Sequence, residues 1–246
     1  VTGSSSPKER ATLELLRSQN IAGLVYYPKR DNIHLEELND FMFAGRPIVI
    51  IDKQTDCPYL NNVVCDNYDG GRQTVRHLLE QGHRNIAFYT AAPLSETSSV
   101  RDRFAGFLHE IKAAGIAPNP QQLVTCCQEL SDDAALSTER TPFQEQLLAM
   151  HRDGITAIIA ENDRIAELIF LACRTIGLRI PEDFCLCGFD DTNVSRSLGI
   201  TSIHQDFAGI GREVGRVLLA ALENPAAETE KIILPVTLVP RSSSLR

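Results

Sequence analysis

Short apolar runs alternate with stretches of helical periodicity along most of the chain. The helical stretches lie at residues 69–81, 98–115, 139–152, 163–177 and 207–223. The apolar runs, which we predict to be buried strands, are residues 21–27, 48–51, 62–65, 86–89, 123–126, 155–160 and 184–187. Continuous apolar strands separated by amphipathic helices are typical of parallel sheets built from crossover units, so the pattern predicts an α/β fold.

Two further helices are predicted near the N-terminus. The first begins at Pro7 with Ser6 as its N-cap, because serine favours the N-cap and proline the first helical position. The second presents its apolar residues on one face, namely Leu35, Leu38, Phe41 and Met42. It is predicted to end at the Gly45-Arg46-Pro47 segment, before the strand at 48–51.

The number of predicted strands indicates a doubled architecture. It exceeds what one small sheet needs, and two consecutive doubly wound units are the natural arrangement. We place the break between them near Gly82. The last apolar segment, residues 232–239, contains Pro235 and is followed by Pro240. Because proline has no backbone N–H to donate within a sheet, this segment is predicted to be an edge strand or a crossing segment.

Composition and charge narrow the class of protein. Of the 246 residues, 43% are hydrophobic and 23% are charged, as in folded globular proteins. The 24 Lys and Arg against 32 Asp and Glu leave a net charge of −8, which argues against a basic nucleic-acid-binding surface on this chain. No apolar run approaches the roughly 18 residues of a membrane-spanning helix, so no membrane protein is expected.

The cysteines and the first residues predict a cytoplasmic location. Seven cysteines are an odd number in a chain too large to need disulfides, which favours a reducing compartment. Residues 1–7 lack the basic segment followed by an apolar segment that marks a signal peptide.

No motif for metal binding or catalysis stands out. The close cysteine pairs, Cys126 with Cys127 and Cys185 with Cys187, lack the two-residue gap of a zinc knuckle and are predicted to be buried small residues. His77 and His83 are not at the i, i+4 spacing of a helical metal site, and structural or surface roles are predicted for both. Neither a phosphate-binding P-loop nor a nucleophile elbow occurs.

The nearest approach to a dinucleotide fingerprint lies within the helical stretch at 207–223. Gly209-Ile210-Gly211 is followed by Gly215, so the third glycine comes one residue late. The apolar face of the same stretch explains these positions by packing alone. We therefore predict no metal, no cofactor and no enzymatic activity.

Polar side chains follow the predicted strands or begin the helices after them. They are Asp69, residues 98–103, residues 161–163 and the pair Asp190-Asp191. In doubly wound sheets the carboxyl ends of the strands open onto the ligand crevice. Aspartate accepts hydrogen bonds from sugar hydroxyls, whereas arginine and asparagine donate to hydroxyl and ring oxygens. The alternative for each residue is a helix cap, and Asp163 in particular has the pattern of a helix-start residue.

Seven strings occur in a fixed order along the chain. They are VCDNYDGG (64–71), HLLEQGHRNIAF (77–88), RDRFAGF (101–107), AEND (160–163), GFDD (188–191), TSIHQDF (201–207) and PRSS (240–243). Together they resemble the effector-binding core of the lactose-repressor/galactose-repressor family of bacterial transcription regulators. The resemblance covers essentially the whole chain.

This resemblance implies a type I periplasmic-binding-protein fold, in which two doubly wound subdomains, joined by three crossovers, close on a small molecule. By the family pattern, residues 1–81 and 207–230 form the N-terminal subdomain, and residues 82–206 and 231–246 form the other. The chain would begin within the family's second strand, so the first strand and first helix, with any ligand contacts they make, would lie outside it.

Carried over position by position, the resemblance implies an effector crevice lined by Asp69, Ser99, Arg103, Asn162, Asp190, Gln205 and Phe207. The chemistry agrees with this set, because the carboxylates, amides and guanidinium bind hydroxyls and any anionic group of the effector, and the aromatic ring offers a face for the C–H side of a sugar. Few basic residues join Arg103, which argues against a multiply phosphorylated effector.

The function implied is that of a ligand-sensing regulatory domain of a repressor, without catalysis. A sugar or sugar derivative would shift the conformation of a homodimer, and operator DNA would be bound only by a helix-turn-helix headpiece that this chain does not contain. Two alternatives stay open: a purine-sensing member of the same family, and a periplasmic sugar-binding protein of a transport system. The cysteines and the lack of an export signal count against the second, and an enzyme on a similar scaffold is weaker still.

Overall fold

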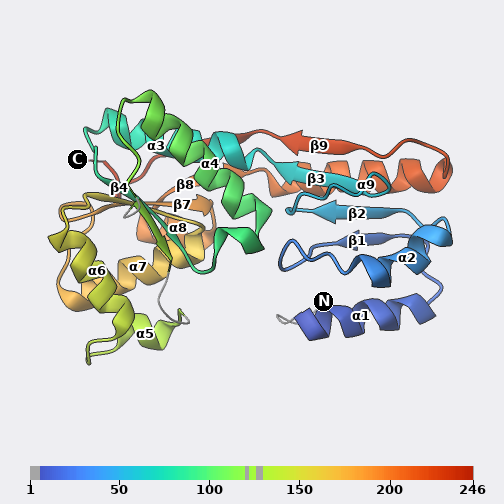
Figure 1. The fold of residues 1–246 in the computed structure, drawn as a ribbon, viewed down its shortest axis with the longest axis horizontal. Coiled ribbons are helices and arrows are strands. Elements are labelled where there is room, and N and C mark those ends of the chain that lie inside the picture. Colours follow the sequence, from blue (N-terminus) through green and yellow to red (C-terminus); the bar gives the residue numbers. More distant parts are fainter. Residues whose placement is uncertain (1–5, 120–121, 126–129, 246) are drawn as a thin grey trace. The chain divides into compact units, whose positions relative to one another are not determined.

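The computed structural model describes residues 6–119, 122–125 and 130–245, and it divides into two units. Unit 1 comprises Val1–Asp66, Ser95–Ser99 and Asp206–Pro235, and unit 2 comprises Asn67–Leu94, Val100–Gln205 and Val236–Arg246. Figure 1 draws the chain as a ribbon and labels most of its helices and strands. Two of the predicted positions lie outside the described residues, namely Cys126, the last residue of the strand predicted at 123–126, and Cys127.

Unit 1 is built on a four-stranded parallel sheet in the order β1-β2-β3-β9. The strands are β1 (Leu24–Tyr26), β2 (Ile48–Ile51), β3 (Asn61–Cys65) and β9 (Lys231–Leu234), and the helices are α1 (Ser6–Ser18), α2 (Leu35–Phe43) and α9 (Phe207–Glu223). Ile48 and Ile50 pack in the core formed with α1 and α2, whereas Val49 packs with α9. Because successive strand residues point to opposite faces, the helices cover both faces of this sheet.

Unit 2 holds a six-stranded sheet in the order β10-β8-β7-β6-β4-β5, parallel except for β10. The strands are β4 (Ile86–Thr90), β5 (Leu123–Thr125), β6 (Ala157–Ala160), β7 (Cys185–Asp190), β8 (Thr201–Gln205) and β10 (Val236–Val239). The helices are α3 (Asn67–Glu80), α4 (Ser98–Ala113), α5 (Asp132–Leu136), α6 (Pro142–Arg152), α7 (Asp163–Ile176) and α8 (Asn193–Leu198), and a short 3-10 turn, η1 (Leu94–Glu96), precedes α4. The first two residues of α4 belong to unit 1.

The core of unit 2 has two layers, one on each face of its sheet. Phe88 packs with α3 and α4, and its neighbour Tyr89 packs with α6 and α7. This alternation along β4 is what a strand covered on both sides requires. The α/β class, with doubly wound parallel sheets, is therefore as predicted.

The strand β8 was not predicted. Its sequence, Thr-Ser-Ile-His-Gln, has one apolar residue, yet Thr201 and Ser202 are buried. The hydroxyl of Ser202 donates to Asp163 at 2.6 Å, and that of Thr201 donates to the carbonyl of Arg241 at 3.1 Å. These side-chain hydrogen bonds replace the hydrogen bonds to water that buried polar residues lose. A search for apolar runs cannot detect a strand of this kind.

The predicted segment 232–239 divides at Pro235 into two strands of different sheets. β9 runs parallel to β3 at the edge of unit 1, and β10 runs antiparallel to β8 at the edge of unit 2. Both parts of the expectation, an edge strand and a crossing segment, are found.

The units differ from the predicted division of the chain at residues 67–81, at Asp206 and at residues 231–235. The helix α3, predicted in the N-terminal subdomain, clusters with unit 2 because Val75 and Leu78 pack in the core with α4. The strand β9, predicted in the other subdomain, clusters with unit 1 because it hydrogen-bonds to β3. Residues 95–99 also belong to unit 1.

Candidate functional site

The residues implied to line the effector site fall into two groups, which we describe one unit at a time. Unit 2 contains Asp69, Arg103, Asn162, Asp190 and Gln205, and unit 1 contains Ser99 and Phe207.

Arg103 is the centre of the unit 2 group. Its side chain is buried, with 5% of its surface exposed. The Nε group donates to the Oδ1 atom of Asn67 at 2.8 Å, and Nη1 donates to the backbone carbonyl of Glu161. The guanidinium carbon lies 3.6 Å from the centre of the Phe189 ring, and Nη2 lies 3.8 Å from the Oδ1 atom of Asp190. A guanidinium held from several directions presents its other N–H groups in a fixed geometry.

Three glycines allow the backbone to approach this arginine. A Cβ atom added to Gly71 would lie less than 3.0 Å from the carbonyl oxygen of Arg103, and one added to Gly106 would lie equally close to that of Tyr68. A Cβ atom at Gly70 would collide with the Phe189 ring. Helices α3 and α4 therefore cross in direct backbone contact. This contact fixes the position of the Arg103 backbone, from which the guanidinium side chain extends.

Asp190 and Gln205 stand at the carboxyl ends of the neighbouring strands β7 and β8. The Nε2 group of Gln205 donates to the Oδ1 atom of Asp190 at 2.6 Å. Asp190 has a φ of 110°, which costs a residue with a side chain of the order of 1–3 kcal/mol. The structure thus brings Arg103, Asp190 and Gln205 together from α4, β7 and β8, and we call these three residues with Asn67 and Phe189 the Arg103 cluster.

Asn162 serves as the N-cap of α7. Its Oδ1 atom accepts a hydrogen bond from the backbone N–H of Ile165 at 3.0 Å, and its Nδ2 group donates to Glu161 at 3.4 Å. The predicted alternative of a helix cap is therefore found at Asn162, and Asp163 is the first helical residue, as its pattern indicated.

Asp163 is buried, and its side chain hydrogen-bonds to neighbouring elements. Its carboxylate accepts from the hydroxyl of Ser202 at 2.6 Å and from the backbone N–H of Thr192 at 2.7 Å. It therefore joins α7 to β8 and to the start of α8.

Asp69 lies in the first turn of α3 and is partly exposed. It accepts from the Nε2 group of Gln73 at 2.7 Å. Gln73 also donates to the carbonyl of Val236 at 3.0 Å and accepts from the N–H of Leu238 at 2.9 Å, which ties Asp69 to β10.

Asp191, next to Asp190, is held by cations instead. Its carboxylate accepts from Arg196 at 2.8 Å, from His204 at 3.0 Å and from Arg241. Burial alone would raise the pKa of this carboxyl, but the hydrogen bonds from Arg196 and Arg241 outweigh it and lower the pKa to about 2. This residue links β7, β8 and the C-terminal segment.

The depressed pKa of Asp191 predicts a loss of stability in acid. Since the pKa falls from 3.8 to about 2 on folding, the ionised carboxylate stabilises the fold above pH 4, and this contribution disappears as the pH falls towards 2. The contribution is about 2 kcal/mol at neutral pH. Asp191→Asn should therefore lower the melting temperature at pH 7 and have little effect at pH 2. Equal effects at both pH values would contradict this, and Asp56→Asn, at an exposed position, is the control.

In unit 1, Ser99 belongs to a cluster that was not predicted. Ser99 is buried and accepts from the Nζ group of Lys53 at 3.2 Å, while Lys53 forms an ion pair with Asp52. The Lys53 ammonium lies 5.3 Å from the centre of the Tyr27 ring. Asp52 and Lys53 directly follow the strand β2, so the rule that polar residues after strand ends mark a site could have found them.

Phe207 is the first residue of α9, and 58% of its surface is exposed. The helix is capped by Asp206, whose carboxylate accepts from the N–H of Gly209 at 2.8 Å. Val214 and Val217 of the same helix are buried in the core of unit 1, so the glycines of this segment belong to a packed helix, as predicted.

Both histidines singled out in the sequence have structural roles, as predicted. His77 pairs with the hydroxyl of Ser244 at 2.7 Å, and burial lowers its pKa. His83 pairs with Thr156 at 2.9 Å and with the Cys185 sulfur at 3.1 Å. Among the described residues, no group of three or more His, Cys, Asp and Glu side chains could hold a metal ion.

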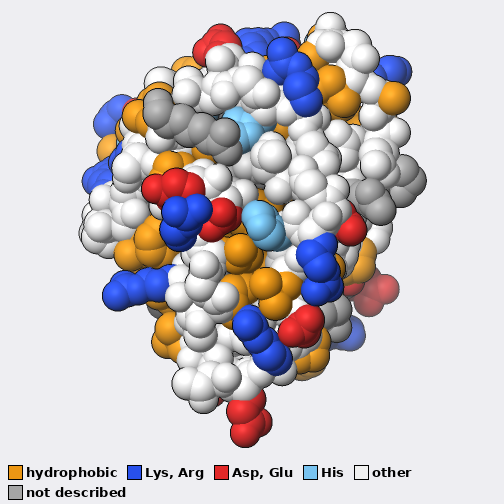
Figure 2. Space-filling model, turned by 90° about the vertical axis from the view of Figure 1, so that its left-hand side faces the viewer, with side chains coloured by type: hydrophobic (Ala, Val, Ile, Leu, Met, Phe, Trp, Pro, Cys, Tyr) orange, Lys and Arg blue, Asp and Glu red, His pale blue; other side chains and the backbone are white. Residues whose placement is uncertain are grey.

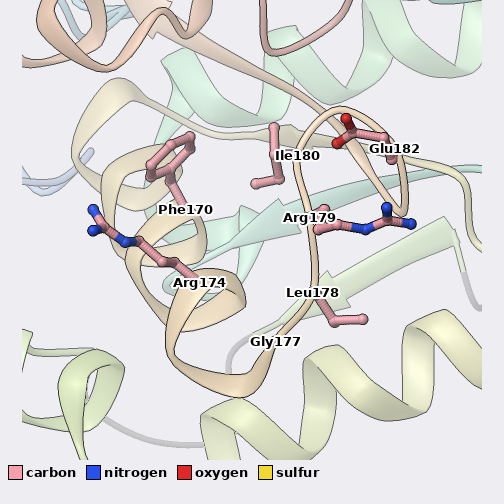
Figure 3. Close-up of a pocket in the computed structure, with 7 residues that line it drawn as sticks. All are labelled: Phe170, Arg174, Gly177, Leu178, Arg179, Ile180 and Glu182. Atoms are coloured by element: carbon pink, nitrogen blue, oxygen red, sulfur yellow. The ribbon is translucent and has the colours of Figure 1, made fainter.

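A hollow of about 380 Å³ lies elsewhere in unit 2, at the C-terminal end of α7. Phe170, Leu178 and Ile180 line it together with Arg174 and Arg179, whose side chains extend in opposite directions in Figure 3. Its lining residues come before β7 in the sequence, so the hollow lies at the amino end of that strand, whereas Asp190 lies at the carboxyl end. It is separate from the candidate site.

The surface gives no sign of a basic patch on the face drawn in Figure 2. Lys and Arg side chains are interspersed with Asp and Glu around a central group of hydrophobic side chains. None of the helices within the described ranges is long and apolar enough to cross a membrane.

Comparisons with known proteins agree with this architecture. Residues 75–244 match the family model described as a periplasmic binding protein-like domain. The chain is 26% identical over 244 residues to the HTH-type transcriptional repressor PurR of Aliivibrio salmonicida, covering 96% of this chain and 68% of that protein. The chain spans about two thirds of the length of the curated relatives that it matches.

Two solved structures are similar over the whole fold. One is a complex of the transcriptional regulator CelR with cellobiose, with 26% identity and a TM-score of 0.81, covering 97% of this chain and 71% of that chain. The other is a dimeric Lac repressor with a C-terminal deletion, with 28% identity and a TM-score of 0.74, covering 100% of this chain and 85% of that chain.

Proposed function

We propose that this chain senses a sugar. The premise is that it belongs to the periplasmic binding protein-like domain family and carries the effector-binding core of lactose-repressor/galactose-repressor regulators. The relatives that it matches are transcriptional regulators, and a similar structure is a complex with cellobiose. The function proposed is ligand-dependent regulation of transcription, without catalysis.

One observation carries this proposal, namely the Arg103 cluster at the carboxyl ends of β7 and β8. A buried arginine, with 5% of its surface exposed, stands beside a carboxylate and a carboxamide. Fixed donors next to fixed acceptors match the hydroxyl groups of a sugar, each of which donates one hydrogen bond and accepts others. Neither a nucleophile with its base nor a bound metal is needed for this role.

In this proposal each residue has a defined part. Asp190 accepts from a sugar hydroxyl, and Arg103 and Gln205 donate to hydroxyl or ring oxygens. Asp69 and the amide group of Asn162 add an acceptor and a donor. Ser99 and Phe207, which belong to unit 1, are proposed to contribute a hydroxyl and an aromatic face for C–H groups.

Signalling would follow from differential affinity. A sugar shifts the protein only towards the conformation that binds it more tightly, and by no more than the difference in binding free energy. We propose that the chain acts in the cytoplasm as a homodimer that passes this shift to a DNA-binding segment outside the sequence described. The similarity to a dimeric Lac repressor supports this assembly.

The proposal predicts a saturable rise in melting temperature with one sugar. A ligand that binds only the folded state stabilises it by about 2.7 kcal/mol at about 100 times its Kd. A thermal-shift screen of sugars, sugar derivatives and purines would measure this. A shift with purines alone would replace the sugar by a nucleobase, and no shift with any of them would contradict the proposal. Sustained turnover of a bound sugar would contradict the absence of catalysis.

A further inference from the structure

We infer that the effector carries no phosphate or carboxylate, and that the candidate site selects an uncharged, hydroxyl-rich molecule. This inference rests on the proposed function and adds the charge of the ligand to it. Two observations support it. The side chains of Arg103 and Lys53, which are buried cations, each lie beside a carboxylate of the protein, and several helix N-termini already donate to side chains.

The positive charge of Arg103 is balanced within the Arg103 cluster. Its Nη2 group lies 3.8 Å from the carboxylate of Asp190. Its Nε group donates to Asn67 at 2.8 Å, Nη1 donates to the carbonyl of Glu161, and the Phe189 ring lies against its plane. The guanidinium keeps N–H groups that can donate to a hydroxyl, but its charge already has a partner.

Further carboxylates lie around this cluster. Glu161, whose backbone carbonyl contacts Arg103, accepts from the N–H of Ala91 at 3.1 Å and follows the end of β6. Asp69 lies in the first turn of α3, and Arg72, three residues later, donates to Glu110 at 2.7 Å and lies 3.9 Å from Asp69. An anionic ligand that contacts the Arg103 guanidinium would therefore also meet the carboxylate of Asp190.

The buried lysine of unit 1 follows the same rule. Only 4% of the surface of Lys53 is exposed, and its ammonium is paired with the adjacent Asp52 and donates to Ser99 at 3.2 Å. Considered by itself, this cluster is also balanced in charge.

Three helix N-termini that carry predicted site residues already donate a backbone N–H to a side chain of the protein. Phosphate sites often use the N–H groups of a first helical turn. At α7 the side chain of Asn162 accepts from Ile165, and at α9 the carboxylate of Asp206 accepts from Gly209. At α4 the N–H of Ser98 donates to the Oδ1 atom of Asp31 at 2.7 Å.

An anionic sugar would therefore lose its hydration without gaining a counter-charge. A neutral sugar avoids this cost, because hydroxyl groups need only the donors and acceptors that the cluster offers. The balance of charges thus discriminates between two ligands that share the same ring and hydroxyls.

Calorimetric titration of the chain with matched sugars tests the inference. The probes are ribose with ribose 5-phosphate, glucose with glucose 6-phosphate and gluconate, and cellobiose with cellobionate. We expect the neutral member of the bound set to bind at least about 100-fold more tightly than its anionic counterpart. An anionic member that binds as tightly or more tightly overturns the inference and leaves the proposed function standing. If no probe binds, neutral or anionic, the proposed function itself is contradicted and the inference falls with it.

Two variants test whether charge balance is the cause. Asp190→Asn removes the counter-charge of Arg103, and Glu161→Gln removes a neighbouring charge while keeping an oxygen that can accept from Ala91. In each, the preference for the neutral over the anionic sugar should fall at least about tenfold. Glu228→Gln, in an exposed loop of unit 1, should leave the preference unchanged. An unchanged preference in both test variants overturns the inference.

Discussion

Arg103→Ala is expected to abolish effector binding, raising the Kd at least about 100-fold while the chain remains folded. The substitution removes the only guanidinium of the Arg103 cluster and leaves the Asp190 carboxylate and the Asn67 amide without its N–H groups. The Phe189 ring would also lose the group that stacks on it. Calorimetric titration with the identified sugar measures the affinity, and circular dichroism reports whether the fold is retained.

Two further variants separate loss of the arginine from a general loss of charge. Arg103→Lys keeps the positive charge but cannot reproduce the planar fork of donors, so most of the affinity should still be lost. Arg164→Ala removes an exposed arginine of α7 that pairs with Asp132 and Glu167, and it should leave the affinity unchanged. An unchanged Kd in Arg103→Ala would remove this residue from the site.

Gly71→Ala is expected to cost about 1–3 kcal/mol of stability or more, and to weaken effector binding as well. The added methyl group would lie less than 3.0 Å from the carbonyl oxygen of Arg103, so α3 and α4 must move apart. Because the backbone on which Arg103 is mounted forms this contact, the guanidinium should shift relative to Asp190. The melting temperature and the Kd for the sugar measure the two effects.

Gly211→Ala is the matched control for this prediction. Gly211 also lies within a helix, α9, but nothing lies within 4 Å of its Cβ position. Alanine is the better helix former, so this variant should be more stable by about 0.5–1 kcal/mol. If both substitutions changed stability in the same direction, the close crossing of α3 and α4 would not be the cause.

Local patterns predicted most of the elements. Ile48, Val49 and Ile50 form a short apolar run, and in the structure they alternate between the two cores of unit 1. Such a run is sufficient because a strand buried on both faces has no polar positions. β8 escaped because its buried residues are polar and depend on partners such as Asp163, 39 residues away.

The candidate site was predictable in part. The rule that polar residues after strand ends form a site selected Asp190, Asn162 and the stretch that contains Arg103, and the family resemblance supplied Gln205. The same rule applies to Asp52 and Lys53, which were missed. Asn67 and Phe189 could not be found in this way, because a helix start and an apolar strand residue have ordinary explanations in the sequence.

The sequence by itself determined the α/β class, most strands and helices, and the polar character of the strand ends, because each depends on residues within one or two turns or strands. Only the tertiary structure decided that α3 packs with unit 2 and β9 with unit 1. It also decided that Arg103 is held by Asn67 and Phe189, and that its charge is balanced by Asp190. These contacts join residues far apart in the chain, and their geometry follows from how the helices and the sheet pack, down to the glycines that let two backbones touch.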